Sequence, residues 1–155
     1  MKVSAQKEYG LRCLLAIANK GAGATMTIPE LSEAEGMSQP YVGKLMSILR
    51  KGGYVTSTRG QIGGYCLASP ASEIKLSAVL AELGGRLFSE DFCDRHPGIQ
   101  EQCAHLHDCA LNGLWAKVQA VVDEVLSQAT LQDLVDRKFD VFSNVDREST
   151  IPVMQ

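Results

Sequence analysis

The fold of this chain is decided by residues 38–67, SQPYVGKLMSILRKGGYVTSTRGQIGGYCL. In its first half, apolar residues recur at helical spacing, a proline lies in the first turn where a missing N–H breaks no hydrogen bond, and a glycine pair ends the helix. The second half is rich in Val and Thr and turns on a run of glycines, which predicts two short antiparallel strands. The expected buried stripe of the helix is Val42, Leu45, Met46 and Leu49. The stretch therefore predicts a helix followed directly by a β-hairpin.

A second short helix comes immediately before this one. Thr27 is its expected N-cap, because Glu30 follows three residues later as in a capping box, and Gly36 ends the helix after two turns. Two short helices joined at Gly36, the second with a polar and basic outer face, describe a helix-turn-helix, and the hairpin behind it is a wing. With a first helix over residues 3–19, we predict a mainly α fold with a small β wing: a winged helix-turn-helix domain over residues 1–85.

The second half of the chain predicts three more helices. Ser77 is the expected cap of a short helix, and Thr130 with Asp133 begins the last one. Between them, a long helix over 110–127 carries apolar residues at alternating gaps of four and three, which is the pattern of a coiled-coil seam. The seam needs a partner helix, either from a second subunit or from the core of its own chain. Its members are Leu111, Trp115, Val118, Val122 and Val125, with Leu114 and Val121 beside them.

These patterns divide the chain into four parts. After the winged domain, residues 86–109 form a loop rich in cysteine and histidine. Residues 110–139 form a dimerisation helix and a C-terminal helix, and residues 140–155, which show no periodicity, are expected to be a flexible tail.

Charge distribution and composition reduce the number of function classes that fit this chain. The net charge of −3 gives no sign of a nucleic-acid partner, but residues 1–67 carry eight Lys or Arg against four Asp or Glu, whereas residues 68–155 carry seven against fourteen. A basic first half is typical of a DNA-reading module joined to a sensing module. No apolar run is long enough to span a membrane and no signal peptide is present, so we expect a cytoplasmic protein. No phosphate-binding loop, dinucleotide fingerprint or catalytic constellation appears, so we do not expect an enzyme.

A dense set of soft ligands lies in residues 92–111, FCDRHPGIQEQCAHLHDCAL. Thiolate and imidazole groups gathered in this way are what an iron–sulfur cluster or a zinc ion needs. The alternative is a loop with ordinary thiols. The cysteine gaps of nine and five residues match neither a zinc ribbon nor a ferredoxin run, so spacing does not choose the metal. The segment holds three of the five cysteines and all three histidines: Cys93, Cys103, Cys109, His96, His105 and His107.

The winged stretch resembles the bacterial winged-helix iron–sulfur transcriptional regulators typified by IscR and NsrR. The residues that carry the resemblance are the run at 49–51, Ser57, Arg59-Gly60 and the run at 63–65, and it extends over residues 1–138. It implies a homodimer whose long helices cross, with each winged helix in a major groove of promoter DNA, each wing in the adjacent minor groove, and a pseudo-palindromic operator.

The same resemblance implies an iron–sulfur cluster held by Cys93, Cys103 and Cys109. Asn112 stands where some family members have a ligating histidine, so the fourth ligand is open. Glu8 matches the position of a carboxylate ligand on the first helix that reaches the cluster of the other subunit; its alternative is an ordinary surface glutamate. His105 and His107 are its rivals by proximity, and His96 is a weaker one. With an oxygen or nitrogen fourth ligand we expect 2Fe-2S, with 4Fe-4S as the close alternative.

On the DNA side, Ser38, Tyr41 and Arg59 match positions that similar proteins use to contact DNA, and Gly60 lies beside Arg59 at the wing tip. Residue type and position on the outer face of the predicted helix add three more candidate DNA contacts. Gln39 is suited to adenine, and Lys44 and Arg50 to phosphate or guanine.

The two cysteines outside the 92–111 segment are not expected to bind the cluster. Cys13 and Cys66, on helix and strand faces, are expected to be packed rather than ligating. We predict a cluster-sensing, dimeric regulator of transcription. The alternatives are a cluster-free thiol-redox regulator, in which a cysteine of the 92–111 segment oxidises, and a zinc-binding regulator.

Overall fold

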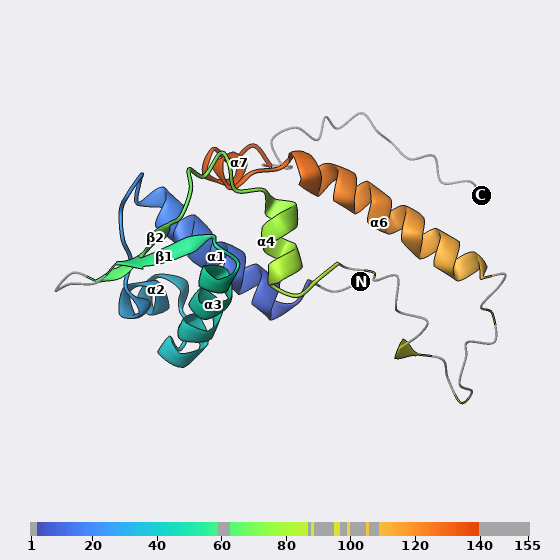
Figure 1. Ribbon diagram of the computed structural model, residues 1–155, viewed down its shortest axis with the longest axis horizontal. Coiled ribbons are helices and arrows are strands. Elements are labelled where there is room, and N and C mark those ends of the chain that lie inside the picture. The colour runs from blue at the N-terminus through green and yellow to red at the C-terminus, as the bar shows by residue number, and fades with distance from the viewer. Residues whose placement is uncertain are drawn as a thin grey trace, which may run out of the picture.

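The computed structural model describes residues 3–58, 63–86, 88, 95, 96, 99, 105 and 109–139. Figure 1 shows a mainly helical molecule with one small hairpin, which confirms the predicted fold class. The elements are α1 (Ala5–Asn19), α2 (Ile28–Glu35), α3 (Gln39–Lys51), β1 (Val55–Thr58), β2 (Gly64–Leu67), α4 (Leu76–Glu82), α6 (Ala110–Gln128) and α7 (Leu131–Val135).

The helix-turn-helix forms as its local signals predict. The Thr27 hydroxyl accepts from the Glu30 amide while the Glu30 carboxylate accepts from the Thr27 amide, so both halves of the capping box are present. Gly36 ends α2 with a φ of 65°, a left-handed conformation that costs glycine little. All four residues of the predicted α3 stripe, at 42, 45, 46 and 49, are buried.

The wing is an antiparallel pair with the register Val55↔Leu67 to Thr58↔Gly64. A third piece of chain joins it, because the Met26 amide donates to the Tyr65 carbonyl at 2.9 Å and the Tyr65 amide donates back at 2.8 Å. Strand β2 of the hairpin is thereby tied to the segment that leads into α2. The wing tip, with Arg59 and Gly60, lies outside the described residues.

The start of α4 corrects the predicted Ser77 cap. The helix begins at Leu76, with Lys75 as its N-cap. The cause is a contact distant in sequence: the Leu76 amide donates to the Ala129 carbonyl at 3.0 Å, and the Leu131 amide donates to the Ile74 carbonyl at 2.9 Å. This bridge holds Lys75 in an extended conformation and starts the helix two residues before the predicted position.

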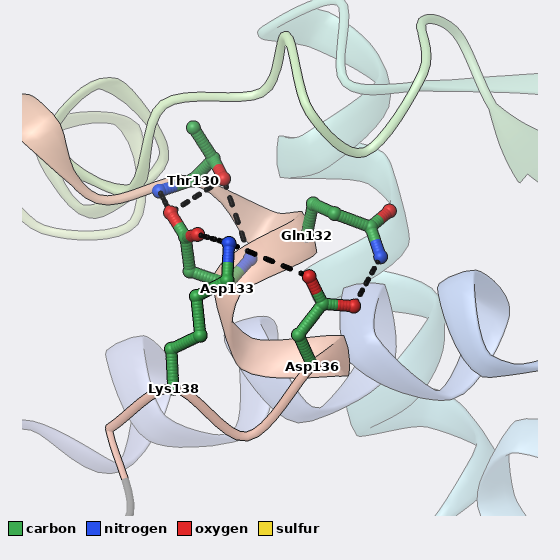
Figure 2. Close-up of polar contacts among 5 residues, drawn as sticks. All are labelled: Thr130, Gln132, Asp133, Asp136 and Lys138. Carbon is green, nitrogen blue, oxygen red and sulfur yellow. Dashed lines mark hydrogen bonds and ion pairs between the residues drawn. The ribbon is translucent and has the colours of Figure 1, made fainter.

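A polar network fixes the C-terminal helix α7 (Figure 2). Thr130 and Asp133 form the predicted capping box, and Lys138 binds the Asp133 carboxylate at 2.7 Å and Asp136 at 3.5 Å. The hydrogen bond from Lys138, followed by those from Thr130, holds the pKa of Asp133 well below its ordinary value. The predicted tail, residues 140–155, lies outside the described residues.

A single core joins the ends of the chain. Residues from α1, α2, α3, β1, α4 and α7 share it, and α7 lies against α1. The helix α6 is different, since it extends away from this core and meets it mainly through α4 (Figure 1). The division of the chain at residues 85, 109 and 139 stays a prediction. The core residues are Cys13, Leu14, Ile17, Met26, Leu31, Val42, Leu45, Met46, Leu49, Val55, Ile74, Leu76, Val79, Leu83, Ala129 and Leu131.

Candidate nucleic-acid interface and metal centre

The outer face of α3 is polar and basic. Gln39, Lys44 and Arg50 are all exposed, opposite the buried stripe, and α3 contains no acidic residue. A helix with this face turned to solvent can enter a major groove and present donors to base edges and phosphates. The predicted contacts of these three residues with DNA stay predictions.

The first turn of α3 leaves one hydroxyl available. Ser38 occupies the N-cap position by its backbone angles, but its side chain makes no hydrogen bond to the helix. Ser38 is also exposed. An unengaged, exposed hydroxyl at the start of a helix suits a phosphate oxygen, in keeping with the predicted DNA contact of Ser38.

Tyr41 is half-buried because its ring packs against α1. The rings of Tyr41 and Tyr9 meet edge to face, with centroids 6.0 Å apart and planes at 86°. The Arg12 guanidinium lies over the Tyr9 ring at 5.2 Å, and its Nε donates to Glu35 Oε2 at 2.7 Å. This hydrogen bond raises the pKa of Arg12. Together these contacts tie α1, the end of α2 and the start of α3 into one unit.

The contacts through Tyr9, Arg12 and Glu35 were missed by the sequence analysis. The available signal was weak: Tyr9 and Arg12 are three residues apart on one side of α1, and neither belongs to its apolar stripe. Nothing in the sequence identifies the partner of either residue on another helix.

At the wing, Gly64 is required by close packing. A Cβ at this position would lie 2.9 Å from both the carbonyl carbon and the carbonyl oxygen of Met26. Since both atoms belong to the backbone, no side-chain rotation relieves the contact. Arg59 and Gly60, the predicted wing contacts with DNA, lie outside the described residues.

Only part of the predicted cysteine site is described. Cys93, Cys103 and His107 lie outside the described residues, whereas His96 and His105 are described and exposed. Within the described ranges, no three His, Cys, Asp or Glu side chains form a metal-binding group. The predicted ligand set therefore remains untested.

Cys109, the last predicted cysteine ligand, lies at the N-cap of α6. It is half-buried, and its Sγ accepts from the Asn112 amide at 3.4 Å. The unpaired N–H groups of the first helical turn stabilise negative charge, so the position is chemically suited to a thiolate ligand. Asn112, where some family members have a ligating histidine, points its backbone amide at this sulfur.

Glu8, the predicted fourth ligand, is exposed on α1. Figure 1 shows the beginning of α6 well separated from α1 of the same chain. A site that used both Glu8 and Cys109 would therefore have to take the glutamate from a second copy of the chain.

The other two cysteines have different surroundings. Cys13 is fully buried, and burial raises the pKa of its thiol to about 12, so it stays protonated at neutral pH. Cys13 is packed, as predicted. Cys66 is half-buried on β2, with its sulfur 3.2 Å from the Thr56 hydroxyl oxygen.

The helix α6 contributes residues to two apolar surfaces. One is a groove of about 470 Å³ between α1, α4 and α6, lined by Leu11, Leu80, Val122 and other residues. The other is a row of apolar residues along α6 at alternating gaps of three and four, and its members Val121 and Val125 also line the groove. In this row Leu111 is 64% exposed and Val125 57% exposed. The row consists of Leu111, Leu114, Val118, Val121 and Val125.

A winged helix-turn-helix with a basic recognition helix and a long outlying helix defines a DNA-binding regulator of transcription. Residues 3–137 match the family Rrf2, described as an iron-dependent transcriptional regulator, and the chain belongs to this family. Its members are regulators of transcription and not enzymes.

Relatives and solved structures agree with this assignment. The chain is 33% identical to protein rrf2 of Nitratidesulfovibrio vulgaris over 135 residues, 87% of each chain. It is similar to the structure of CymR, the global cysteine regulator of B. subtilis, with a TM-score of 0.70, 28% identity, and 88% and 98% of the two chains covered. It is equally similar to T. potens IscR, with a TM-score of 0.70, 29% identity, and 89% and 88% covered. Among the described helices, none has the length and apolar character needed to cross a membrane.

Proposed function

We propose that this protein is a cytoplasmic, homodimeric regulator that binds promoter DNA and senses redox state, nitric oxide, iron or iron–sulfur status through an iron–sulfur cluster. The observation that carries the proposal is the position of Cys109. It is the last of three cysteines in one segment, and it begins α6, the helix with the exposed apolar row. A change of state at this sulfur therefore acts at the start of the helix through which two copies would associate.

In this proposal Cys93, Cys103 and Cys109 hold the cluster, and Glu8 of the partner subunit supplies the fourth ligand, with His105 and His107 as rivals. The separation of α1 from the beginning of α6 supports a ligand from the partner. A cluster of the 2Fe-2S type is preferred, and 4Fe-4S is the alternative. When bound, the cluster supplies one-electron redox chemistry and a site that oxidants and nitric oxide attack.

The exposed row on α6 supports the proposed dimer. Apolar residues at 111, 114, 118, 121 and 125 repeat every 3.5 residues on average, which is the spacing of a coiled-coil seam. An isolated chain would leave this row in water, so the proposed partner is the same row of a second copy. The two copies of α3 would then enter major grooves about 34 Å apart, one helical turn of DNA.

On DNA, each side chain has a separate role. Ser38 and the α3 N-terminus bind phosphate, and Gln39, Lys44 and Arg50 read bases or bind phosphate. Tyr41 contacts DNA from a ring held by Tyr9. At the wing, Arg59 enters the minor groove with Gly60 beside it.

A second candidate function keeps the DNA binding without the cluster. The chain is as similar to CymR, named as a cysteine regulator, as it is to IscR. In this version a cysteine of the 92–111 segment is a reversible redox switch, or the segment binds zinc.

Anaerobic purification followed by iron, sulfide and zinc analysis, a visible spectrum and binding to operators selected from genomic fragments tests these functions together. We expect stoichiometric iron and sulfide, visible iron–sulfur absorbance, and operator affinity that changes when the cluster is removed. Cys103→Ala should abolish iron binding, whereas the matched Cys66→Ala variant should retain it. Stoichiometric zinc would support the zinc-binding regulator. A metal-free protein whose operator binding is peroxide-sensitive would support the thiol switch.

A further inference from the structure

A buried glutamine stands out on α6. Gln119 is only 5% exposed, although the residues on either side of it along much of the helix face solvent. Burial of an amide costs free energy unless its donor and acceptor groups are both satisfied. The side-chain oxygen and nitrogen of Gln119 both have hydrogen-bond partners, and these partners indicate its role.

The partners of Gln119 tie the cysteine-bearing segment to the helix. Its Oε1 accepts from the Phe88 backbone amide at 2.8 Å, and its Nε2 donates to Asp123 Oδ1 at 2.7 Å. The other oxygen of Asp123 pairs with the guanidinium of Arg86. Arg86 and Phe88 lie at the start of the 86–109 segment, directly after the turn at Gly84 and Gly85 that closes α4.

The segment is therefore attached to α6 at both ends. Its last residue, Cys109, is the N-cap of the helix, and its first residues bind ten and fourteen positions further along, at Gln119 and Asp123. The same two side chains line the groove between α1, α4 and α6. A change of state in this segment can therefore act on α6 at two places, its N-terminus and the positions of Gln119 and Asp123.

We infer that Gln119 and Asp123 form a polar clasp that holds the start of the cysteine-bearing segment on α6 and transmits the state of the cysteines to the dimer helix. The inference rests on the proposed sensing function. Gln119 is a positioning residue in this account, because its described partners are Phe88 and Asp123 and it acts through the segment and the helix.

The test compares Gln119→Leu with Gln128→Leu in the full-length dimer. Gln128 is the exposed last residue of the same helix, so the control makes the same substitution outside the clasp. Two measurements are made: hydrogen exchange of the Phe88 amide by NMR, and operator affinity of the cluster-loaded, metal-free and peroxide-treated forms.

In Gln119→Leu we expect the Phe88 amide to exchange about tenfold faster or more, since its acceptor is gone. We expect the ratio of operator affinities between forms to fall about tenfold toward one. Gln128→Leu should match the wild type in both measurements. Unchanged exchange at Phe88 overturns the clasp, and a wild-type affinity ratio in a variant with a released Phe88 amide overturns its transmitting role.

Two further comparisons keep the outcomes separate. If Gln119→Leu does not fold, Asp123→Asn removes the ion pair with Arg86 while keeping the glutamine, with Glu124→Gln as its neighbouring exposed control. We expect Asp123→Asn to reduce the affinity ratio by the same amount, and Glu124→Gln to keep the wild-type ratio. If the wild type itself binds its operator equally in all three forms, the sensing function fails together with the transmission, whereas the Phe88 exchange still decides the clasp.

Discussion

At the scale of single residues, the capping carboxylates couple helix formation to pH. Glu30 accepts from the Thr27 amide at 2.7 Å and from the Thr27 hydroxyl at 2.9 Å, and it pairs with Lys20 at 3.1 Å. The hydrogen bonds from Thr27, followed by that from Lys20, lower the pKa of Glu30 from 4.5 to about 2. The carboxylate is therefore stabilised most when the helix-turn-helix is formed.

This shift predicts how acid affects the fold. Because the folded-state pKa is below 4.5, the contribution of Glu30 to stability is fully present above that pH and is lost as the pH falls to about 2. We expect Glu30→Gln to lower the Tm near neutral pH and to flatten its dependence on pH in this window, as followed by circular dichroism. Glu33→Gln, an exposed carboxylate on the same helix, should keep the wild-type slope. A wild-type slope in Glu30→Gln would contradict the assignment.

Single residues also show which signals a sequence carries. Thr27 and Glu30 are three residues apart, so their capping box is readable from the chain. Ser77 was wrong as a cap because the bridge between the segments at 74–76 and 129–131 starts α4 early. Gln119 and Arg12 gain their roles from partners 31 and 23 positions away, and no local pattern specifies those partners.

At the scale of elements, the wing depends on a close approach between backbones. Gly64 leaves room for the exchange of hydrogen bonds between Met26 and Tyr65, which joins the hairpin to the chain before α2. The hairpin and the helix-turn-helix are thus held in one orientation. This relation matters for DNA binding because α3 and the wing are expected to contact adjacent grooves.

Substitution at this contact should disturb both stability and binding. In Gly64→Ala the new Cβ meets Met26 backbone atoms at 2.9 Å, so the hairpin must shift. We expect a loss of about 1–3 kcal/mol in the free energy of unfolding, measured by urea titration, with weaker operator binding. Gly43→Ala on α3 is the control for stability, because its Cβ would lie 3.7 Å from Ile28 Cδ1, an ordinary contact. Equal stability of Gly64→Ala and wild type would show that the hairpin is not fixed there.

The element α6 was predicted by its period, but the structure assigns its faces. Val122, expected in the seam, is half-buried in the groove, whereas Leu111 and Leu114 are exposed and Val121 and Val125 are exposed at the groove's edge. Two apolar faces on one helix cannot be separated by spacing alone, because both fit a helical period. Contact with α4 decides which face turns inward.

At the scale of the whole molecule, the exposed row on α6 makes association testable. Charge placed in a coiled-coil seam is buried without a partner, which opposes dimerisation. We expect Val121→Glu with Val125→Glu to convert the dimer to a monomer in sedimentation experiments and to weaken operator binding by about a hundredfold or more. Ala120→Glu, on an exposed position outside the row, should remain dimeric. A dimeric double variant would place the interface elsewhere.

The molecule as a whole limits what the sequence could predict of the site. The recognition helix and wing follow from contiguous residues, so both were predictable. The ligand set was expected from the resemblance, and of its cysteines only Cys109 has a described position. The separation of α1 from the beginning of α6 within one chain is a property of the assembled fold, since it depends on how α6 leaves the core.

The place of α7 in the core has a consequence for biosynthesis. Leu131 is buried together with residues of α1, so the last described helix completes what the first one begins. A ribosome must therefore release the chain as far as α7 before the core can close. A premature stop codon shortly before α7 would yield a product with uncovered apolar surface, a substrate for chaperones and proteases rather than a smaller regulator.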